Sequence, residues 1–173
     1  MSEEKARKIK ASGLPRMKMP EQDPSRRASN FEEVPYGITL EMAMDEASRC
    51  LQCPKPRCKT ACPVNINIPQ FIAEISHGNP QAAAEKLKTQ TALPAVCGRV
   101  CPQENQCEGS CVLGIRGEPV AIGALERFAA DYVRQHNLEK TPEKAAPTGK
   151  RVAVIGCGPA GITAAADLAI AGH

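Results

Sequence analysis

The sequence predicts a mainly α-helical fold that ends in the first strand and helix of an α/β domain. Three observations lead to this prediction. Apolar residues recur at helical spacing in three segments between residues 38 and 136. Eight cysteines fall in two quartets within the same region, and thiols at short, fixed intervals are typical of a soft metal centre. A short apolar run at 151–155 then leads into a glycine turn and an alanine-rich segment.

Four helices are expected in the first 136 residues, over 38–50, 67–78, 79–88 and 122–136. Thr39 is a suitable N-cap for the first helix, because its hydroxyl can accept from a free backbone N–H of the first turn. Pro69 and Pro80 fall in first turns, where a missing backbone donor costs little. Residues 1–36 show no such pattern, and we expect an extended arm broken by prolines.

The cysteines of the two quartets are Cys50, Cys53, Cys58 and Cys62, then Cys97, Cys101, Cys107 and Cys111. The first quartet ends in Cys-x3-Cys-Pro, as does the two-cluster bacterial ferredoxin motif, although four residues separate Cys53 from Cys58 where that motif has two. Two [4Fe–4S] clusters are the leading hypothesis. The alternative is a zinc-stabilised interaction module without a redox role. Zinc modules favour paired Cys-x2-Cys knuckles, and only Cys50 and Cys53 fit that spacing.

Glu126 is a further candidate ligand, since it falls on the apolar stripe of the fourth helix. That stripe consists of Ile122, Leu125, Ala129, Tyr132 and Val133. Arg127, Asp131 and Arg134 are expected to point away from it. A carboxylate on an apolar face needs a partner, because burying it alone is costly. That partner is either water or a lysine at the rim, or a cluster iron. Spacing alone also leaves open whether Cys97 or Glu126 completes the second site.

The last third of the sequence predicts a linker and the start of a second domain. Residues 139–150 are polar and contain prolines, as interdomain linkers do. A strand at 151–155, a glycine turn and a helix to about residue 171 would open a Rossmann dinucleotide-binding unit. The turn residues that would contact the dinucleotide are Gly156, Gly158, Pro159, Ala160 and Gly161.

Composition narrows the function classes. The net charge is only +3, and the basic residues of the N-terminal arm are not interleaved with aromatics, so we expect no nucleic-acid partner. The arm is expected to be solvated or packed on a partner domain. There is no apolar run of signal-peptide or transmembrane type, so no membrane association is expected. A reducing cytoplasm is therefore expected, in which the cysteines act as ligands rather than bridges.

Several segments together resemble one family over about residues 20–173. They include Gln22-Asp23-Pro24, Ala47 to Leu51, Ala61 to Val64, Leu93 to Pro102, Cys107 to Cys111 and Ile122 to Arg127. These segments are similar to the N-terminal iron–sulfur domain of the glutamate synthase small subunit. They are also similar to the corresponding segments of NADH-dependent ferredoxin:NADP oxidoreductase and of dihydropyrimidine dehydrogenase.

The resemblance implies an α-helical ferredoxin-like domain over 37–138 in which ligation crosses between the quartets. The implied ligands are Cys50, Cys53, Cys58 and Cys111 for the first cluster and Cys62, Cys101, Cys107 and Glu126 for the second. Cys97 would then be a nearby residue that does not bind iron. Residues 151–173 would begin an FAD-binding Rossmann domain.

The resemblance also implies an oxidoreductase, first of the glutamate synthase (NADPH) small-chain type. In such enzymes NADPH or NADH reduces FAD, and two [4Fe–4S] clusters carry electrons between the flavin and a partner. The partner would be a large-subunit-like chain or ferredoxin, within an oligomer. The alternatives in the family are a ferredoxin:NADP oxidoreductase and a dihydropyrimidine dehydrogenase-type subunit. Because the Rossmann unit is incomplete at His173, we expect a fragment without catalytic activity of its own.

Overall fold

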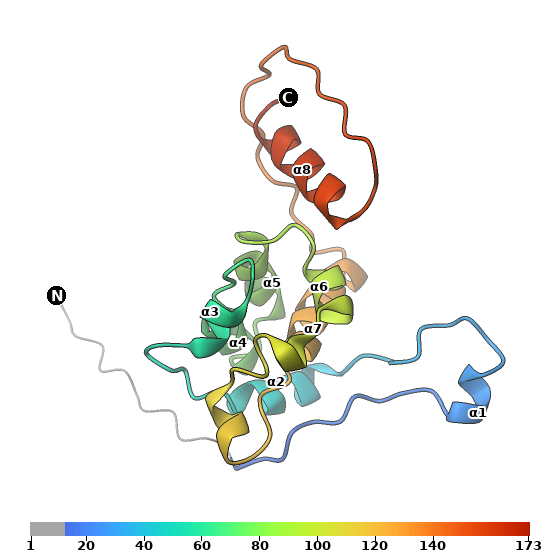
Figure 1. The fold of residues 1–173 in the computed structure, drawn as a ribbon, viewed down its shortest axis with the longest axis vertical. Helices are drawn as coiled ribbons and strands as arrows, with labels where there is room; N and C mark the ends of the chain where they lie inside the picture. The colour runs from blue at the N-terminus through green and yellow to red at the C-terminus, as the bar shows by residue number, and fades with distance from the viewer. Residues whose placement is uncertain (1–12) are drawn as a thin grey trace.

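The structure is a computed structural model that describes residues 13–173. Within these residues the regular secondary structure is helical, apart from one isolated β-bridge between Glu21 and Pro35 (Figure 1). The α-helices are α1 Pro24–Arg27, α2 Leu40–Ser48, α3 Arg57–Ala61, α4 Ile68–Ser76, α5 Pro80–Lys88, α6 Pro94–Val100, α7 Ile122–Gln135 and α8 Pro159–Ile170. Two 3-10 helices, η1 Gln103–Asn105 and η2 Val112–Ile115, lie between α6 and α7.

The four helices expected in the first 136 residues are present as α2, α4, α5 and α7. Thr39 caps α2 as predicted, and its hydroxyl accepts from the backbone N–H of Met42 at 3.2 Å. Helices α3 and α6 lie inside the cysteine loops and were not predicted. They are 5 and 7 residues long, which is too short for a helical period to show in the sequence.

Helices α2, α4, α5 and α7 enclose one apolar core (Figure 1). Its largest fully buried side chains include Phe71, Ile72, Ile75, Leu87 and Leu125. The packing brings the C-terminus of α2 together with the N-termini of α4 and α7, because Cys50, Ile68 and Ile122 line one cavity. Both cysteine loops are therefore anchored at the same end of the core.

Helix α6 crosses α7 at very short range. A Cβ atom on Gly98 would lie 2.6 Å from the backbone nitrogen of Arg127, closer than any ordinary contact. Only glycine fits there, and this close approach sets the second cysteine loop directly against the helix that carries Glu126.

The described part of the arm, residues 13–36, leaves the bundle, turns at α1 and returns (Figure 1). It is not simply extended as expected. Asp23 accepts from the N–H of Ser25 at 2.9 Å, which caps the short helix, and Pro24 occupies its first turn. Across the loop, Gln22 N donates to the carbonyl of Val34 at 2.9 Å. The arm is thus a hydrogen-bonded loop with its own internal structure.

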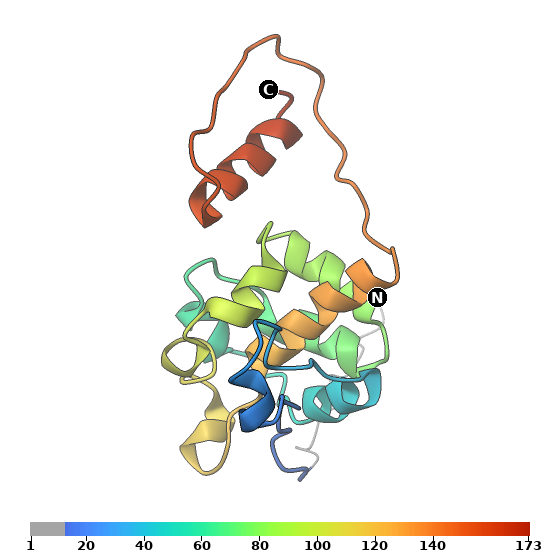
Figure 2. The same cartoon turned by 90° about the vertical axis from the view of Figure 1, so that its right-hand side faces the viewer.

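The C-terminal segment stands apart from the bundle in both ribbon views (Figure 2). The strand predicted at 151–155 is not formed, and Ile155 is 99% exposed. A parallel strand takes its hydrogen bonds from neighbouring strands, and residues 13–173 contain none. The helix that follows is present as α8, and the segment before residue 149 folds back along its end, where Ala145 N donates to the carbonyl of Ile170 at 2.8 Å.

Candidate metal centre

Four thiols from both cysteine loops share one cavity. Cys50, Cys53 and Cys58 come from the loop after α2, and Cys111 is the residue before η2. The remaining walls are largely apolar, with Ile68, Ile72, Val112, Val120 and Ile122 among them. We call this space the four-thiol cavity. The sequence had placed these cysteines in two separate quartets, and the fold brings one member of the second quartet to three of the first.

The backbone helps to aim these thiols. Gln52 lies between Cys50 and Cys53 and has a φ of 46°, a left-handed conformation that non-glycine residues seldom adopt. It turns the chain sharply enough for both thiols to reach the same cavity. Such backbone strain is found where a site requires a fixed geometry.

Burial keeps the thiols of the four-thiol cavity protonated as long as no metal is bound. The pKa values of Cys50 and Cys58 are raised to about 11, mainly by burial and also by the neighbouring Cys53 and Cys111. Buried thiols without a cation keep their protons, because a lone thiolate loses its hydration. A positively charged iron centre would displace these protons and compensate the thiolates. The donor set therefore fits an iron–sulfur cluster.

A second group consists of Cys62, Cys97, Cys101, Cys107 and Glu126. The pKa of Cys107 is raised to about 12, mainly by burial and also by the nearby Glu108, Cys62 and Glu126. Burial also raises the pKa of Cys101, with further contributions from Glu126 and Cys62. Cys62 of the first quartet therefore lies close enough to Cys101 and Cys107 of the second to raise their pKa values. The two groups share no thiol.

Glu126 is buried as its helical position predicts, and it is only 6% exposed. Its Oε1 atom has no hydrogen-bond partner in the described part of the chain. Burial raises its pKa to about 7. No lysine or arginine of residues 13–173 pairs with it. A buried carboxylate oxygen without a partner, next to thiols, is the arrangement that a metal ligand requires.

Cys97 lies on α6 within the second group. Burial raises its pKa to about 11, and both Glu126 and Cys101 contribute. Its Sγ atom is 4.0 Å from the hydroxyl of Thr91. Cys97 and Glu126 therefore both lie near Cys101. No three Cys, His, Asp or Glu side chains of residues 13–173 converge closely enough to hold a single metal ion.

Sequence reasoning missed a buried charge network at the start of α7. Glu46 Oε1 accepts from the backbone N–H of Ala121 at 2.8 Å and from Arg49 at 2.6 Å. Glu108 Oε1 accepts from the N–H of Gly123 at 3.0 Å. These two carboxylates take N–H groups that a helix N-terminus leaves without partners, and they suit its positive end. They fix the start of the helix that carries Glu126.

The arm completes this network. Glu108 Oε2 pairs with Arg16 at 2.6 Å, and Glu46 Oε2 accepts from the backbone N–H of Met17 at 2.7 Å. A signal for Glu46 was present in the sequence, since it lies three residues after Ala43 on the buried face of α2. Glu108 lies in an irregular loop and gave no such signal.

The burial of Arg127 was not expected from the helical pattern of α7. It is only 6% exposed, and it donates to the carbonyl of Pro35 at 2.9 Å. It also pairs with Asp131 and with Glu33 of the arm, each at 3.3 Å. The arm covers this polar face of the helix. A helical period reports which face is apolar but not whether another segment lies over the polar face.

The turn before α8 needs glycine at two of its positions. Gly156 has a φ of 107°, which side-chain-bearing residues rarely adopt. A Cβ atom on Gly161 would collide with the carbonyl oxygen of Gly156, so α8 begins tightly against the turn. Gly158 is the N-cap residue and has open space around it, while Pro159 and Ala160 form the first turn. An exposed helix N-terminus of this kind can bind a phosphate group.

No helix in residues 13–173 is both long and apolar enough to cross a membrane.

The family that matches this chain agrees with the two groups of iron ligands described above. Residues 27–138 match the family described as dihydropyrimidine dehydrogenase domain II, 4Fe-4S cluster. The chain belongs to this family. The match spans every proposed iron ligand, from Cys50 to Glu126. The helical fold and the resemblance inferred from the sequence are thereby confirmed.

Several curated relatives of this 4Fe-4S family member are oxidoreductase subunits. The glutamate synthase [NADPH] small chain of Halomonas elongata is 40% identical over a stretch that covers 83% of the present chain. The glutamate synthase [NADPH] small chain of Escherichia coli is 38% identical over 88% of the present chain. The present chain is also 38% identical to the NAD-dependent dihydropyrimidine dehydrogenase subunit PreT of Escherichia coli over 83% of its length. The chain spans 30%, 32% and 34% of the length of these relatives.

Proposed function

We propose that this chain is the electron-transfer part of a flavin-dependent NAD(P)H oxidoreductase, of the glutamate synthase small-chain type. The observation that carries the proposal is the exchange of donors between the cysteine loops in a 4Fe-4S family domain. Cys111 joins the first quartet at the four-thiol cavity, while Cys62 joins the second group.

The proposed ligand sets follow these groups. They are Cys50, Cys53, Cys58 and Cys111 for one [4Fe–4S] cluster and Cys62, Cys101, Cys107 and Glu126 for the other. When bound, the clusters supply one-electron chemistry between a flavin and a partner. The chain itself holds the donors in place, excludes water with apolar walls and releases thiol protons on loading. Cys97 is proposed to lie beside the second cluster without binding it.

The rest of the proposal concerns the remaining segments and the partners. Residues 37–138 would be the iron–sulfur domain, 139–150 a linker and 151–173 the start of an FAD domain. The glycine turn fits a pyrophosphate because Gly158 leaves its backbone open beside the N-terminus of α8. We further propose a cytoplasmic enzyme that uses NADPH or NADH and assembles with a large-subunit-like chain. The relatives named as small chains or subunits support a partner subunit.

Spectroscopy of the anaerobically purified chain tests the proposal. We expect a brown protein that bleaches with dithionite and holds about eight irons and eight sulfides per chain, as two [4Fe–4S] clusters require. A colourless protein with two zinc ions would instead establish the zinc-stabilised module.

A second candidate within the family is supported by the PreT relative, whose identity nearly equals that of the glutamate synthase small chains. Under this second proposal the chain is part of a dihydropyrimidine dehydrogenase-type subunit or of a ferredoxin:NADP oxidoreductase. The full-length polypeptide with its partner, supplied with NADPH or NADH, separates these activities. Glutamate formation from glutamine and 2-oxoglutarate supports the first proposal, and pyrimidine reduction supports the second.

A further inference from the structure

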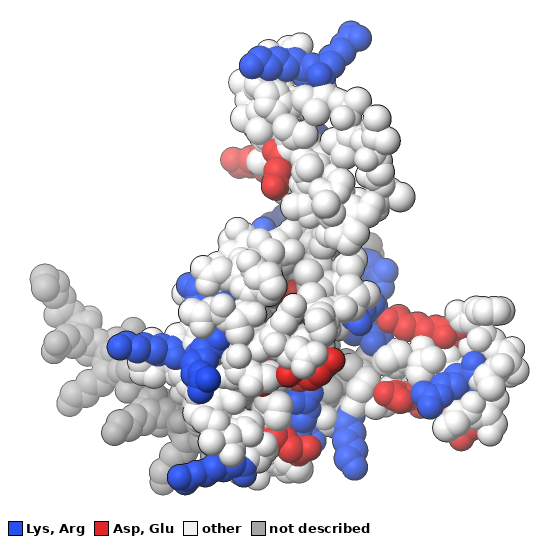
Figure 3. Space-filling model, viewed as in Figure 1, with Lys and Arg blue, Asp and Glu red and all other residues white. Residues whose placement is uncertain are grey.

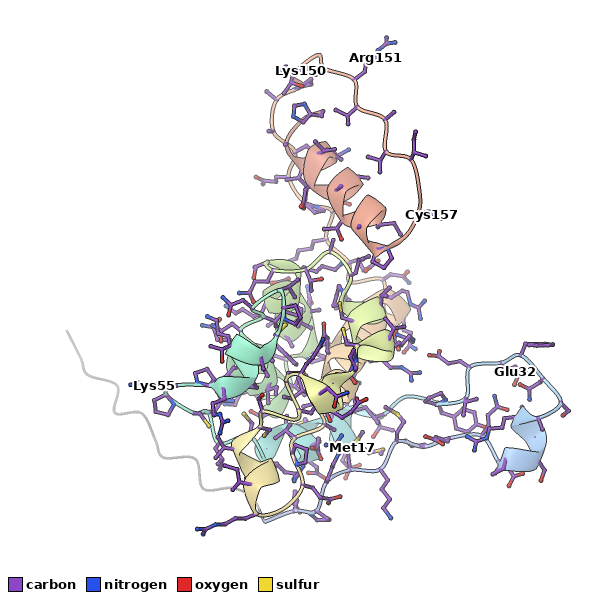
Figure 4. All side chains as sticks on the ribbon, viewed as in Figure 1. Met17, Glu32, Lys55, Lys150, Arg151 and Cys157 are labelled. Carbon is purple, nitrogen blue, oxygen red and sulfur yellow. The ribbon has the colours of Figure 1, made fainter. Side chains whose placement is uncertain are left out.

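Three cations lie on the loop that contributes Cys53 and Cys58 to the four-thiol cavity. They are Lys55, Arg57 and Lys59, and Arg57 is itself part of the cavity wall. Lys55 and Arg57 are exposed and Lys59 is half-buried. We call these three residues the basic rim. Figure 4 shows Lys55 projecting outward from the bundle.

Most other cations of the bundle form ion pairs, whereas the residues of the basic rim do not within the described chain. In residues 38–138, Arg49, Lys88, Arg99, Arg127 and Arg134 each form an ion pair with a carboxylate. None of the three rim residues has an ion pair within the described chain. No Asp or Glu occurs between Glu46 and Glu74, so these cations have no carboxylate near them in the sequence. Figure 3 shows basic side chains, without acidic ones among them, on the flank where Lys55 lies.

Apolar side chains are exposed beside these charges. Val64 follows the last cysteine of the same loop and is 51% exposed. Val112 is 37% exposed and also lines the four-thiol cavity. Protein–protein interfaces combine apolar contact area with a polar rim, and this face offers both. No aromatic residue lies between positions 37 and 70 to stack on a nucleic-acid base, which disfavours a single-stranded nucleic acid.

We propose that the basic rim is the docking surface for an acidic redox protein, which exchanges electrons at the four-thiol cavity. This inference rests on the proposed function. Complementary charge would steer the partner to this face and fix its orientation, because field lines from unpaired cations reach beyond the surface. The exchange moves one electron, so one protein is oxidised as the other is reduced, and no bond is formed or broken. The electron comes from NAD(P)H through the proposed flavin.

The test uses the iron-loaded chain and a plant-type ferredoxin, an acidic [2Fe–2S] protein, as the probe. The dissociation constant is measured at low and at high salt. We expect the triple variant Lys55→Glu, Arg57→Glu and Lys59→Glu to bind at least about tenfold more weakly at low salt and to lose most of the salt dependence. Carbodiimide cross-linking should join the probe to Lys55 or Lys59 in the unmodified chain.

A matched control reverses the same charges elsewhere. Lys144→Glu, Lys150→Glu and Arg151→Glu change two lysines and one arginine on the exposed C-terminal segment (Figure 4). Binding by this variant should stay within about twofold of the unmodified chain. Equal losses in the two variants, no binding by the unmodified chain, or tighter binding to a DNA duplex would each overturn the inference. Iron and sulfide are measured first, so a chain without clusters refutes the proposed function separately.

Discussion

At the scale of single residues, Glu126 is the most informative side chain in the molecule. Its position on an apolar helical stripe predicts burial, and the structure leaves its Oε1 atom buried and without a partner. An isolated carboxylate in such surroundings is destabilising unless it is protonated or meets a cation. A cluster iron would provide that cation.

Replacement of Glu126 tests this role. In Glu126→Ala we expect the EPR signal of one reduced cluster to change or disappear, because a hard oxygen donor is removed from a site with three thiolates. The other cluster's signal should persist. Glu104→Ala, at an exposed position in η1, is the control and should leave both signals unchanged. If both signals survive in Glu126→Ala, the carboxylate does not bind iron.

Cys97 gives the converse prediction. It lies near Cys101 and Glu126, yet the proposed ligand set does not require its thiol. Cys97→Ser should therefore retain about eight irons per chain and both EPR signals. Loss of iron from this variant would make Cys97 the eighth ligand and exclude the proposed set. Cys101→Ser, at a proposed ligand, is the matched variant that should lose iron.

At the scale of elements, the start of α7 is held by groups that are distant in the sequence. Its N-cap residue, Ala121, has no side chain that can cap the helix, so Glu46 from α2 and Glu108 from the second cysteine loop accept from its first N–H groups. The orientation of α7, and with it the place of Glu126, thus depends on two buried carboxylates.

Removing one of these carboxylates should be costly. Glu46→Ala leaves Arg49 buried without its ion-pair partner and frees the N–H groups of Ala121 and Met17. We expect the free energy of unfolding of the iron-loaded chain to fall by about 3–5 kcal/mol, as for other broken buried pairs. Denaturant titration measures this. Glu41→Ala, exposed on the same helix, should change it by less than about 0.5 kcal/mol, and equal losses would argue against the network.

At the scale of the whole molecule, the arm is fastened to the bundle by charges. Glu33 pairs with Arg99 at 2.7 Å and with Arg127 at 3.3 Å, while Arg99 also pairs with Asp131 at 2.7 Å. The hydrogen bond from Arg99 lowers the pKa of Glu33 below its ordinary value. The arm is therefore attached most firmly where Glu33 is ionised.

Acid should loosen this attachment. Because the pKa of Glu33 is lower in the folded chain, its contribution to stability is complete above the unfolded value of 4.5 and is lost as the pH falls through the lowered one. The contribution is small, under about 1 kcal/mol, since Glu33 is half exposed. Hydrogen exchange of residues 20–36, compared between pH 7 and pH 4, should show faster opening in acid.

Two variants separate this effect from general acid loosening. Glu33→Gln should open the arm already at pH 7 and remove most of the difference between the two pH values. Glu32→Gln, which breaks only a pair with Arg26 inside the arm, should keep the behaviour of the unmodified chain. An arm that opens equally in both variants would show that Glu33 does not fasten it.

The sequence alone predicts the helices in which apolar residues recur at helical spacing. The stripe on α7 predicts the burial of Glu126, and the caps and prolines predict the starts of α2, α4 and α5. It does not predict what lies over a polar face, so the burial of Arg127 beneath the arm was missed. The apolar pattern at 151–155 predicts a strand but does not show whether a neighbouring strand is available. In the described residues there is none for it to pair with.

The four-thiol cavity has a consequence for how the protein is made. Cys50, Cys53 and Cys58 are translated 53 to 61 residues before Cys111, yet all four face the same space. A nascent chain therefore carries three reactive thiols without their fourth companion until residue 111 has left the ribosome. Assembly of the proposed cluster needs all four residues and therefore follows the synthesis of residue 111, and before that the three thiols lack the cluster that would protect them from oxidation.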